Sequence, residues 1–157
     1  MANFSVDLSK WTAKTSKTIS KVVREVVIGL AERIDERSPV GNPSLWDEEF
    51  TKVATKLEWT GPGYVGGHYR MNNQYGFGSP PQGEIDGVDT AGTVALAKTV
   101  SGVSAAPVIG VHYIVNNVPY AQAIEDGHSG QAPQGVYGLA AVDFQGIVDA
   151  KVARLKK

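Results

Sequence analysis

Apolar residues recur at helical spacing through the first quarter of the chain and predict one long amphipathic helix from about Leu8 to about Glu36. The pair Ser38-Pro39 ends it, because a residue before proline is pushed out of the helical region. A helix of about 29 residues is about 43 Å long, whereas a globule of this size has a radius of gyration of about 15 Å. We therefore expect part of it to pack on a neighbouring subunit. The apolar positions are Trp11, Thr15, Ile19, Val22, Val23, Val26, Val27, Leu30 and Ile34.

Later in the chain, short helical and short extended patterns alternate. The predicted helices are residues 47–57, 90–103 (capped by Asp89 or Thr90) and 143–155, and the predicted strands are 70–78, 108–115 and about 135–142. We expect a single domain over residues 1–157, with an irregular insertion loop at 42–67. The fold class is α+β, in which the long N-terminal helix packs on a small, mostly antiparallel sheet with shorter helices.

The stretch from Ile114 to Pro133 is typical of a rigid corner. Asn116-Asn117 suits a tight turn, because short amide side chains bond to local backbone and tolerate left-handed dihedral angles. Pro119 fits the first turn of a helix, and Gly127 stops that helix. The loop that follows is predicted to present polar side chains at the surface: Glu125, Asp126 and His128.

Charge is distributed unevenly, although the formal net charge is only −1. Residues 1–24 carry +4 and residues 149–157 carry +3, so the remainder carries −8. Such polarity is typical of a protein that stacks against other proteins. Five cations form a basic stripe opposite the apolar face of the long helix, and it is either a solvated surface or a contact for DNA or an acidic partner. The basic stripe comprises Lys10, Lys14, Lys17, Lys21 and Arg24.

The chain lacks the residue patterns of common active sites. It has no cysteine, and its three histidines fall on separate predicted elements. No nucleophile, base and orienting group occur together, and no apolar run is long enough to cross a bilayer. Gly61 to Gly66 formally matches a dinucleotide-binding motif, but no buried strand precedes it. We expect neither enzymatic activity, nor a cofactor, nor a bound metal.

Aromatic side chains in the insertion loop are candidates for contact with other molecules. They can stack on nucleic-acid bases, pin the loop to the domain, or fill a groove on a partner protein. The three residues are Trp46, Trp59 and Tyr64.

Three segments together resemble a known family. Val118-Pro119-Tyr120-Ala121, followed by Glu125, Gly127, Ser129, Gln131, Ala132 and Pro133, resembles the hallmark of the neck, or tail-completion, proteins of tailed bacteriophages. Arg37 to Gly41 is similar to an element that follows the family's long first helix, and His68 to Asn73 is similar to a basic and aromatic segment before its first strand. The matches span residues 37–142, and the chain departs from the pattern at residues 42–67.

This resemblance implies a structural virion protein of the head–tail junction, similar to tail terminators. Such a protein is made in the host cytoplasm and forms a homo-oligomeric ring, here expected to be a hexamer, around the DNA channel. The ring links the head connector or head-closure protein to the tail-tube proteins and needs no membrane. The expected subunit-interface residues are Tyr120, Glu125, Gly127, His128 and Gln131. The expected partner or DNA contacts are the basic stripe and the three loop aromatics.

Two alternatives from other classes stay open at this point. One is a capsid decoration or head-closure protein, which differs from a neck protein in its place in the particle. The other is a small metal-dependent hydrolase that uses the loop from Glu125 to His128, which predicts stoichiometric metal and loss of activity on His128→Ala.

Overall fold

The computed structural model describes residues 4–43, 48–56 and 65–155. Helix α1 runs from Phe4 to Arg37, and its 34 residues make it about 51 Å long. The predicted long helix is therefore confirmed: it begins four residues earlier and ends one residue later than the apolar spacing indicates. Trp46, Trp59 and Tyr64 lie outside the described residues, so their predicted contacts stay predictions.

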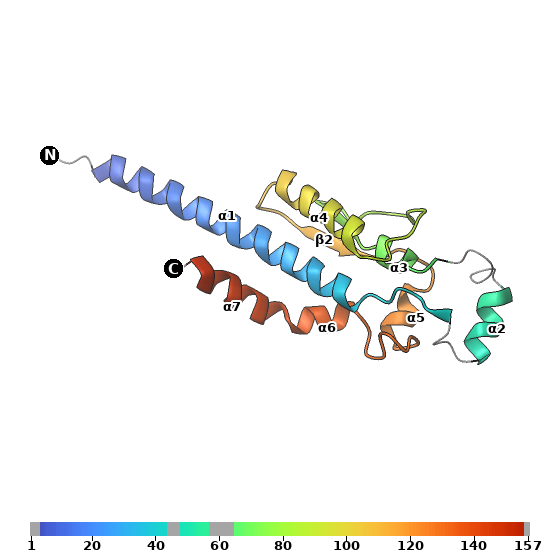
Figure 1. Cartoon of the computed structure of the whole chain (residues 1–157). Coiled ribbons are helices and arrows are strands. Elements are labelled where there is room, and N and C mark those ends of the chain that lie inside the picture. Colours follow the sequence, from blue (N-terminus) through green and yellow to red (C-terminus); the bar gives the residue numbers. More distant parts are fainter. Residues whose placement is uncertain (1–3, 44–47, 57–64, 156–157) are drawn as a thin grey trace.

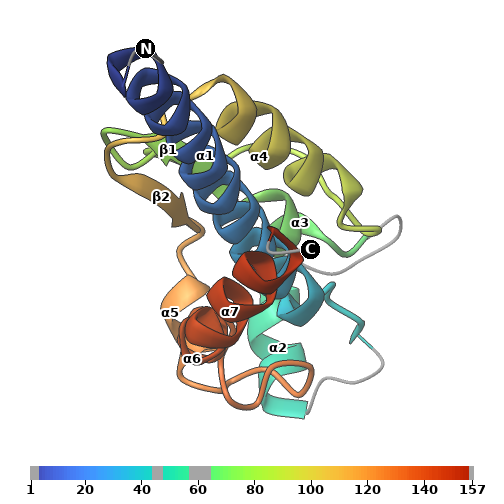
Figure 2. The same cartoon turned by 90° about the vertical axis from the view of Figure 1, so that its left-hand side faces the viewer.

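Two groups of helices flank the second half of α1 (Figures 1 and 2). Helix α4 (Thr93–Ala105) lies on one side, and α6 (Tyr137–Val142) followed by α7 (Phe144–Leu155) lies on the other. Both the 90–103 and the 143–155 predictions are confirmed as helices. Three shorter helices complete the described chain: α2 (Glu48–Lys56), α3 (His68–Met71) and α5 (Ala121–Glu125).

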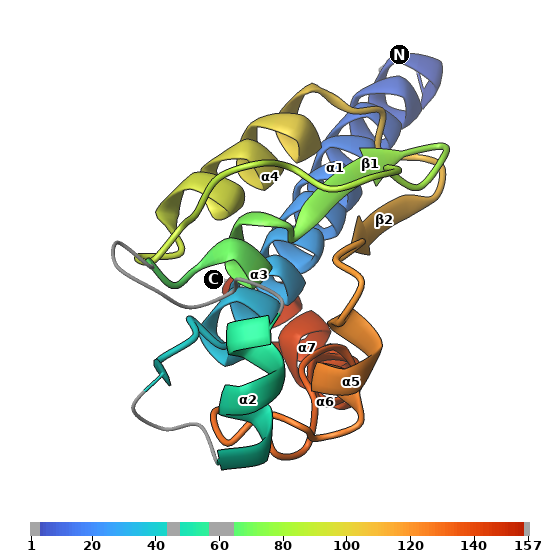
Figure 3. The same ribbon diagram turned by 90° about the vertical axis from the view of Figure 1, so that its right-hand side faces the viewer.

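The described sheet has two strands. Strand β1 (Gln74–Phe77) pairs antiparallel with β2 (His112–Val115), so that Gln74 lies opposite Val115 and Phe77 opposite His112. The sheet packs on α4, where the Tyr75 ring lies so close to Gly102 that a Cβ there would be 2.6 Å from a ring carbon. Figure 3 shows the two strands beside α4 and α1. Together with α1, this small antiparallel sheet confirms the α+β class.

The two strands that form are shorter than the predicted segments 70–78 and 108–115. Arg70 and Met71 belong to α3, because the guanidinium of Arg70 is held by carbonyls from other segments, a contact that a local pattern does not contain. Residues 108–111 precede β2 instead of joining it. Gly110 has a φ of 148° and lies against the Phe77 ring, where a side chain would clash.

The predicted strand at 135–142 is wrong, because these residues form helix α6. The cause lies ten residues upstream. The carboxylate of Glu125 accepts hydrogen bonds from the backbone N–H groups of Val136, Tyr137 and Gly138, which are the free donors at the start of a helix. This distant acceptor outweighs the strand preference of Val136 and Tyr137.

The main core lies where the end of α1 meets α3, α5 and α6. Ile34 contributes from α1, and residues from the other elements close around it with little exposed surface. This core holds the segment after α1 against the corner and the residues that follow it, up to about residue 140. Its buried members are Ile34, Tyr69, Val118, Ile124, Ala132, Val136 and Ala140.

Candidate assembly surface

A buried polar cluster, called the joint below, connects four separate segments of the chain. Its centre is Asn73, which is 8% exposed and donates from Nδ2 to Ser38 Oγ at 2.9 Å. Asn73 Oδ1 accepts from Asn116 Nδ2 and from the Tyr137 hydroxyl, both at 3.0 Å. Asn116 Nδ2 also donates to the carbonyl of Tyr69 at 2.8 Å. Both acceptor positions of Asn73 Oδ1 are thus used, for the end of β2 and the start of α6, while its Nδ2 holds the end of α1 and Asn116 holds α3.

An ion pair extends the joint toward α4. Arg70 donates to the carbonyls of Ser38 and Thr90, each at 3.0 Å, and its Nε lies 3.7 Å from Asp35 Oδ1. Burial raises the pKa of Asp35 to about 6, although the Arg70 guanidinium partly offsets this and Asp89 adds to it. The end of α1, the segment at 37–41 and the turn that precedes α4 are therefore tied to one guanidinium.

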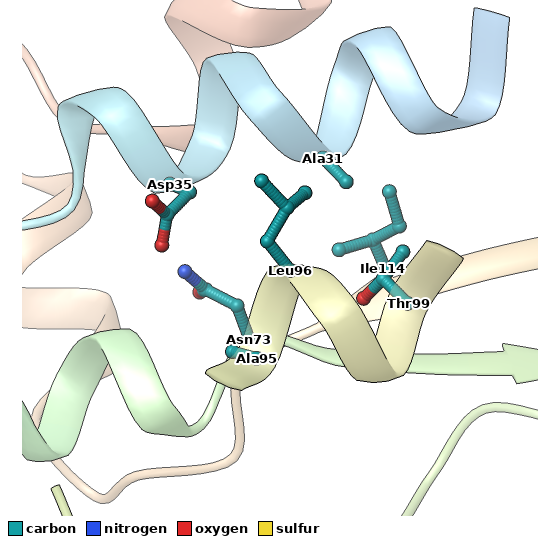
Figure 4. A pocket seen from close by; sticks show the side chains of 7 residues that line it. All are labelled: Ala31, Asp35, Asn73, Ala95, Leu96, Thr99 and Ile114. Atoms are coloured by element: carbon teal, nitrogen blue, oxygen red, sulfur yellow. The ribbon is translucent and has the colours of Figure 1, made fainter. Parts of the chain in front are cut away.

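A small cavity lies beside this ion pair (Figure 4). Its volume is about 10 Å³, the space for about one water molecule. Asp35 Oδ1 and Arg70 Nε have no hydrogen-bond partner within the described residues. The site is too small for an organic ligand. The residues that line the cavity are Ala31, Asp35, Asn73, Ala95, Leu96, Thr99 and Ile114.

Glu125, an expected interface residue, caps helix α6 through its carboxylate. Oε2 accepts from Val136 N and Tyr137 N at 2.9 Å, and Oε1 accepts from Gly138 N at 2.7 Å. Burial alone would raise the pKa of Glu125, but the three backbone N–H groups together outweigh it and hold that pKa below its usual value. Glu125 is half-buried, and both of its carboxylate oxygens are bound within the chain, so the carboxylate shapes the loop from within.

Gly127 ends α5 as the sequence predicts. Its φ is 86°, in the left-handed region that glycine favours, and its N–H donates to Ile124 O at 3.1 Å. The N–H of His128 donates to Ala123 O at 3.0 Å, so the two bonds form a Schellman motif. A Cβ on Gly127 would lie 2.6 Å from the carbonyl oxygen of Pro133. This glycine folds the loop back on itself.

The remaining interface candidates lie around the same corner. Tyr120 is half-buried, with its ring 6.4 Å from the ring of Tyr69. His128 and Gln131 are exposed, and Gln131 Oε1 accepts a hydrogen bond from Val40 N at 3.0 Å. The structure thus brings all five predicted residues into one corner, where His128 and Gln131 are exposed and Glu125 and Gly127 shape the loop.

The basic stripe divides into exposed lysines and one arginine that acts within the chain. Lys14, Lys17 and Lys21 are exposed, whereas Arg24 donates to Val103 O and Ala106 O at 3.3 and 3.2 Å. These carbonyls lie at the C-terminal end of α4, where a cation is favourable. Lys10 belongs to α1, but its side chain lies outside the described part of the structure.

The histidines do not form a shared site. His68 lies between Glu84 (3.1 Å) and the carbonyl of Gly87 (2.9 Å), and His112 Nδ1 lies 2.8 Å from the Tyr75 hydroxyl. Across the described ranges, no three or more His, Asp or Glu side chains gather into a group that can hold a metal ion.

Several residues of the joint escaped the sequence analysis as functional positions. Ser38, Arg70 and Asn73 lie inside the segments that carry the family resemblance, but nothing local indicates that they meet. Their contacts join residues 32 to 64 positions apart. In the sequence, these positions could have been indicated by the clustering of Asn, Ser and Arg next to Pro39 and around Tyr69.

Within residues 4–43, 48–56 and 65–155, no helix has both the length and the apolar content to span a membrane. Compared with known proteins, the chain matches no family model, no curated protein and no solved structure.

Proposed function

We propose that this chain is a structural protein of the head–tail junction of a tailed bacteriophage. In this proposal its copies form a ring, expected to be a hexamer, between the head connector and the tail-tube proteins, and the ring surrounds the DNA channel. The protein acts by binding its neighbours, without a chemical step and without a cofactor.

One observation carries the proposal: the segments that resemble neck proteins meet in one place. Residues 37–41, 68–73 and 118–133 are far apart in sequence, yet Asn73 bonds to Ser38, the Tyr69 ring lies 6.4 Å from the Tyr120 ring, and Gln131 bonds to Val40. Unrelated matches would have no reason to converge on one buried cluster. Their convergence supports reading the three matches as one structural unit.

The joint also has a physical role in this function. A subunit of a ring that transmits load between head and tail must hold its contact surface rigidly. Here the corner loop is fixed by the Glu125 cap, the Gly127 turn and the Gln131 bond to Val40. The exposed residues His128 and Gln131 are thereby held at one position relative to α1, as a subunit contact requires.

The test is a depletion and complementation experiment in the phage whose genome encodes the chain. Particles assembled without the protein are expected to give filled heads and separate tails, and the protein supplied in trans restores joined particles. Normal joined particles in its absence would contradict the proposal. Decoration or head closure instead predicts fragile or leaking heads, so head integrity separates these alternatives.

A matched pair of variants links that phenotype to the corner. His128→Asp/Gln131→Asp changes two exposed corner residues, and Lys52→Asp/Lys56→Asp makes the same number of substitutions on exposed positions of α2. The corner variant is expected to fold, as judged by circular dichroism, but to fail in complementation, whereas the α2 variant complements. Equal complementation by both variants would remove the corner from the subunit contact.

A further inference from the structure

Among the described residues, helix α1 has neighbours from its own chain along only about half of its length. On one side, α4 ends where Arg24 binds the carbonyls of Val103 and Ala106. On the other side, α7 runs antiparallel to α1, and Ile147 and Lys151 both lie against Gly29. Continuing at the same rise per residue, the end of α7 comes level with about Val23 of α1. Both flanking helices therefore stop near the middle of α1 (Figure 1).

Exposure along the apolar side of α1 changes at this point. Val26, inside the covered half, is 7% exposed, whereas Ile19, two turns earlier on the same side, is 55% exposed. The apolar spacing in the sequence continues further toward the N-terminus. The uncovered half of α1 is about as long as the covered half. A second pair of helices as long as α4 and α7 would therefore cover it.

The solvent-facing side of α1, between α4 and α7, reverses its charge at the same level. Three exposed lysines precede the middle of the helix, and three glutamates at continuing steps of three, four or seven follow it. The first half of this face is basic and the second half is acidic, although all six residues belong to one helix. The residues are Lys14, Lys17 and Lys21, followed by Glu25, Glu32 and Glu36.

We propose that two copies of this chain pair through α1, antiparallel, about a two-fold axis near Val23. In this register Lys14 of one copy faces Glu32 of the second copy, and Lys21 faces Glu25. The two-fold axis repeats both contacts with the copies exchanged, so opposite charges meet on both sides of the axis. A parallel pair in register would instead oppose lysine to lysine and glutamate to glutamate.

The shape of the subunit fits the same arrangement. In the antiparallel pair, the covered half of each α1 lies beside the uncovered half of the other. The α4 and α7 helices of the second copy then flank the first half of α1 without meeting the α4 and α7 of the first copy, because each set stops near the axis.

A two-fold contact closes with two copies and does not propagate around a ring. The pair is therefore distinct from the head-to-tail contacts of a cyclic assembly, and we assign it to the free protein. It does not depend on the proposed function. A chain that dimerises in solution but never enters a phage particle would refute the proposed function and leave the pair intact. A chain that joins the head–tail junction but stays monomeric in solution would refute the pair and leave the proposed function intact.

Charge exchange tests the pair on the purified full chain. Lys14→Glu/Lys21→Glu makes all four facing positions (14, 21, 25 and 32) acidic, and Glu25→Lys/Glu32→Lys makes all four basic. Native mass spectrometry and sedimentation should give a wild-type mass of twice 16.7 kDa at low salt. Each variant alone should dissociate at least about tenfold more readily, and a mixture of the two should restore a mixed dimer, because all four facing positions again carry opposite charges.

A control variant isolates the position of the charges from their number. Lys52→Glu/Lys56→Glu makes the same charge change on exposed residues of α2 and should leave the dimer unchanged. Circular dichroism of each variant verifies folding. Three results would each overturn the proposal. The wild-type chain could stay monomeric at every protein and salt concentration, or its assemblies could grow beyond two copies. The third is a mixture of the two variants that fails to pair although both variants fold.

Discussion

The Glu125 cap on α6 gives a quantitative prediction. Its carboxylate accepts three backbone N–H groups at 2.7 to 2.9 Å, and one of them belongs to Val136, which is fully buried. Glu125→Ala removes all three acceptors at once. Loss of a helix cap costs about 0.5–2 kcal/mol, and a buried donor left without a partner costs about 1–3 kcal/mol. Because Gly138 is exposed and its N–H can bond to water, we expect a total loss of about 2–4 kcal/mol.

Glu125→Gln separates charge from geometry. The amide keeps one oxygen near the same donors but removes the negative charge at the helix N-terminus, so about 1 kcal/mol should be lost. Asp126→Ala is the matched control, since this neighbouring carboxylate is exposed and bonds only to the exposed Gln122 among the described contacts. It should change stability by less than about 0.5 kcal/mol.

Urea unfolding at neutral pH, followed by circular dichroism, measures these differences. The pH dependence adds a second test. Since the folded-state pKa of Glu125 lies below its usual value of 4.5, its stabilisation is present above 4.5 and is lost as pH falls through the lowered pKa. The gap between wild type and Glu125→Ala should therefore shrink in acid. A loss below about 0.5 kcal/mol for Glu125→Ala would refute the capping argument.

Three further predictions concern the joint and its corner. The pKa of Asp35 is raised in the folded state from 3.8 to about 6, so the folded protein holds this proton more tightly than the unfolded chain does. The free energy of unfolding of the wild type should therefore fall by about 1–3 kcal/mol between pH 4 and 6.5 relative to that of Asp35→Asn. Urea unfolding at several pH values measures this difference, and parallel pH curves for the two proteins would contradict it. Asn73→Ala should lower the free energy of unfolding by about 2–4 kcal/mol in the same assay, because it leaves the buried Ser38 hydroxyl and the Tyr137 hydroxyl without this partner. A loss near zero would mean that the joint does not stabilise the fold. Gly127→Ala should lower the melting temperature and cost about 1–3 kcal/mol, since φ is positive there and the new Cβ meets a carbonyl; an unchanged melting temperature would exclude the turn described for this glycine.

The sequence predicted those elements that local chemistry determines. The apolar spacing and Ser38-Pro39 located α1 within a few residues, and Gly127 marked the end of α5. Asp89 was predicted as a cap for α4, and its carboxylate accepts hydrogen bonds from the backbone N–H groups of Thr93, Val94 and Ala95. In each of these cases the deciding interaction joins residues within one or two turns of each other.

The errors arise where distant residues decide the structure. Residues 135–142 favour a strand locally, but the Glu125 carboxylate supplies the acceptors for a helix start. The capping role of Glu125 was missed for the same reason, since its partners follow 11 to 13 residues later. The joint around Asn73 was not predicted at all, because amide side chains carry no signal of which distant partner they bond to.

The charge reversal along α1 could in principle have been read from the sequence, because its lysines and glutamates follow helical spacing. What the sequence could not give is the point at which α4 and α7 stop. That point, near Arg24, coincides with the change of sign and turns a charge pattern into a proposed contact surface. The proposal thus depends on tertiary structure as well as on the order of charges.

The central claim is that this protein acts by assembling with its neighbours at the head–tail junction. Electron cryo-microscopy of intact particles of the encoding phage tests it most directly. We predict a ring of copies at the head–tail vertex, with the corner around His128 and Gln131 in contact with the adjacent subunit. Particles that lack the protein, or that carry it only on the capsid surface, would contradict the claim.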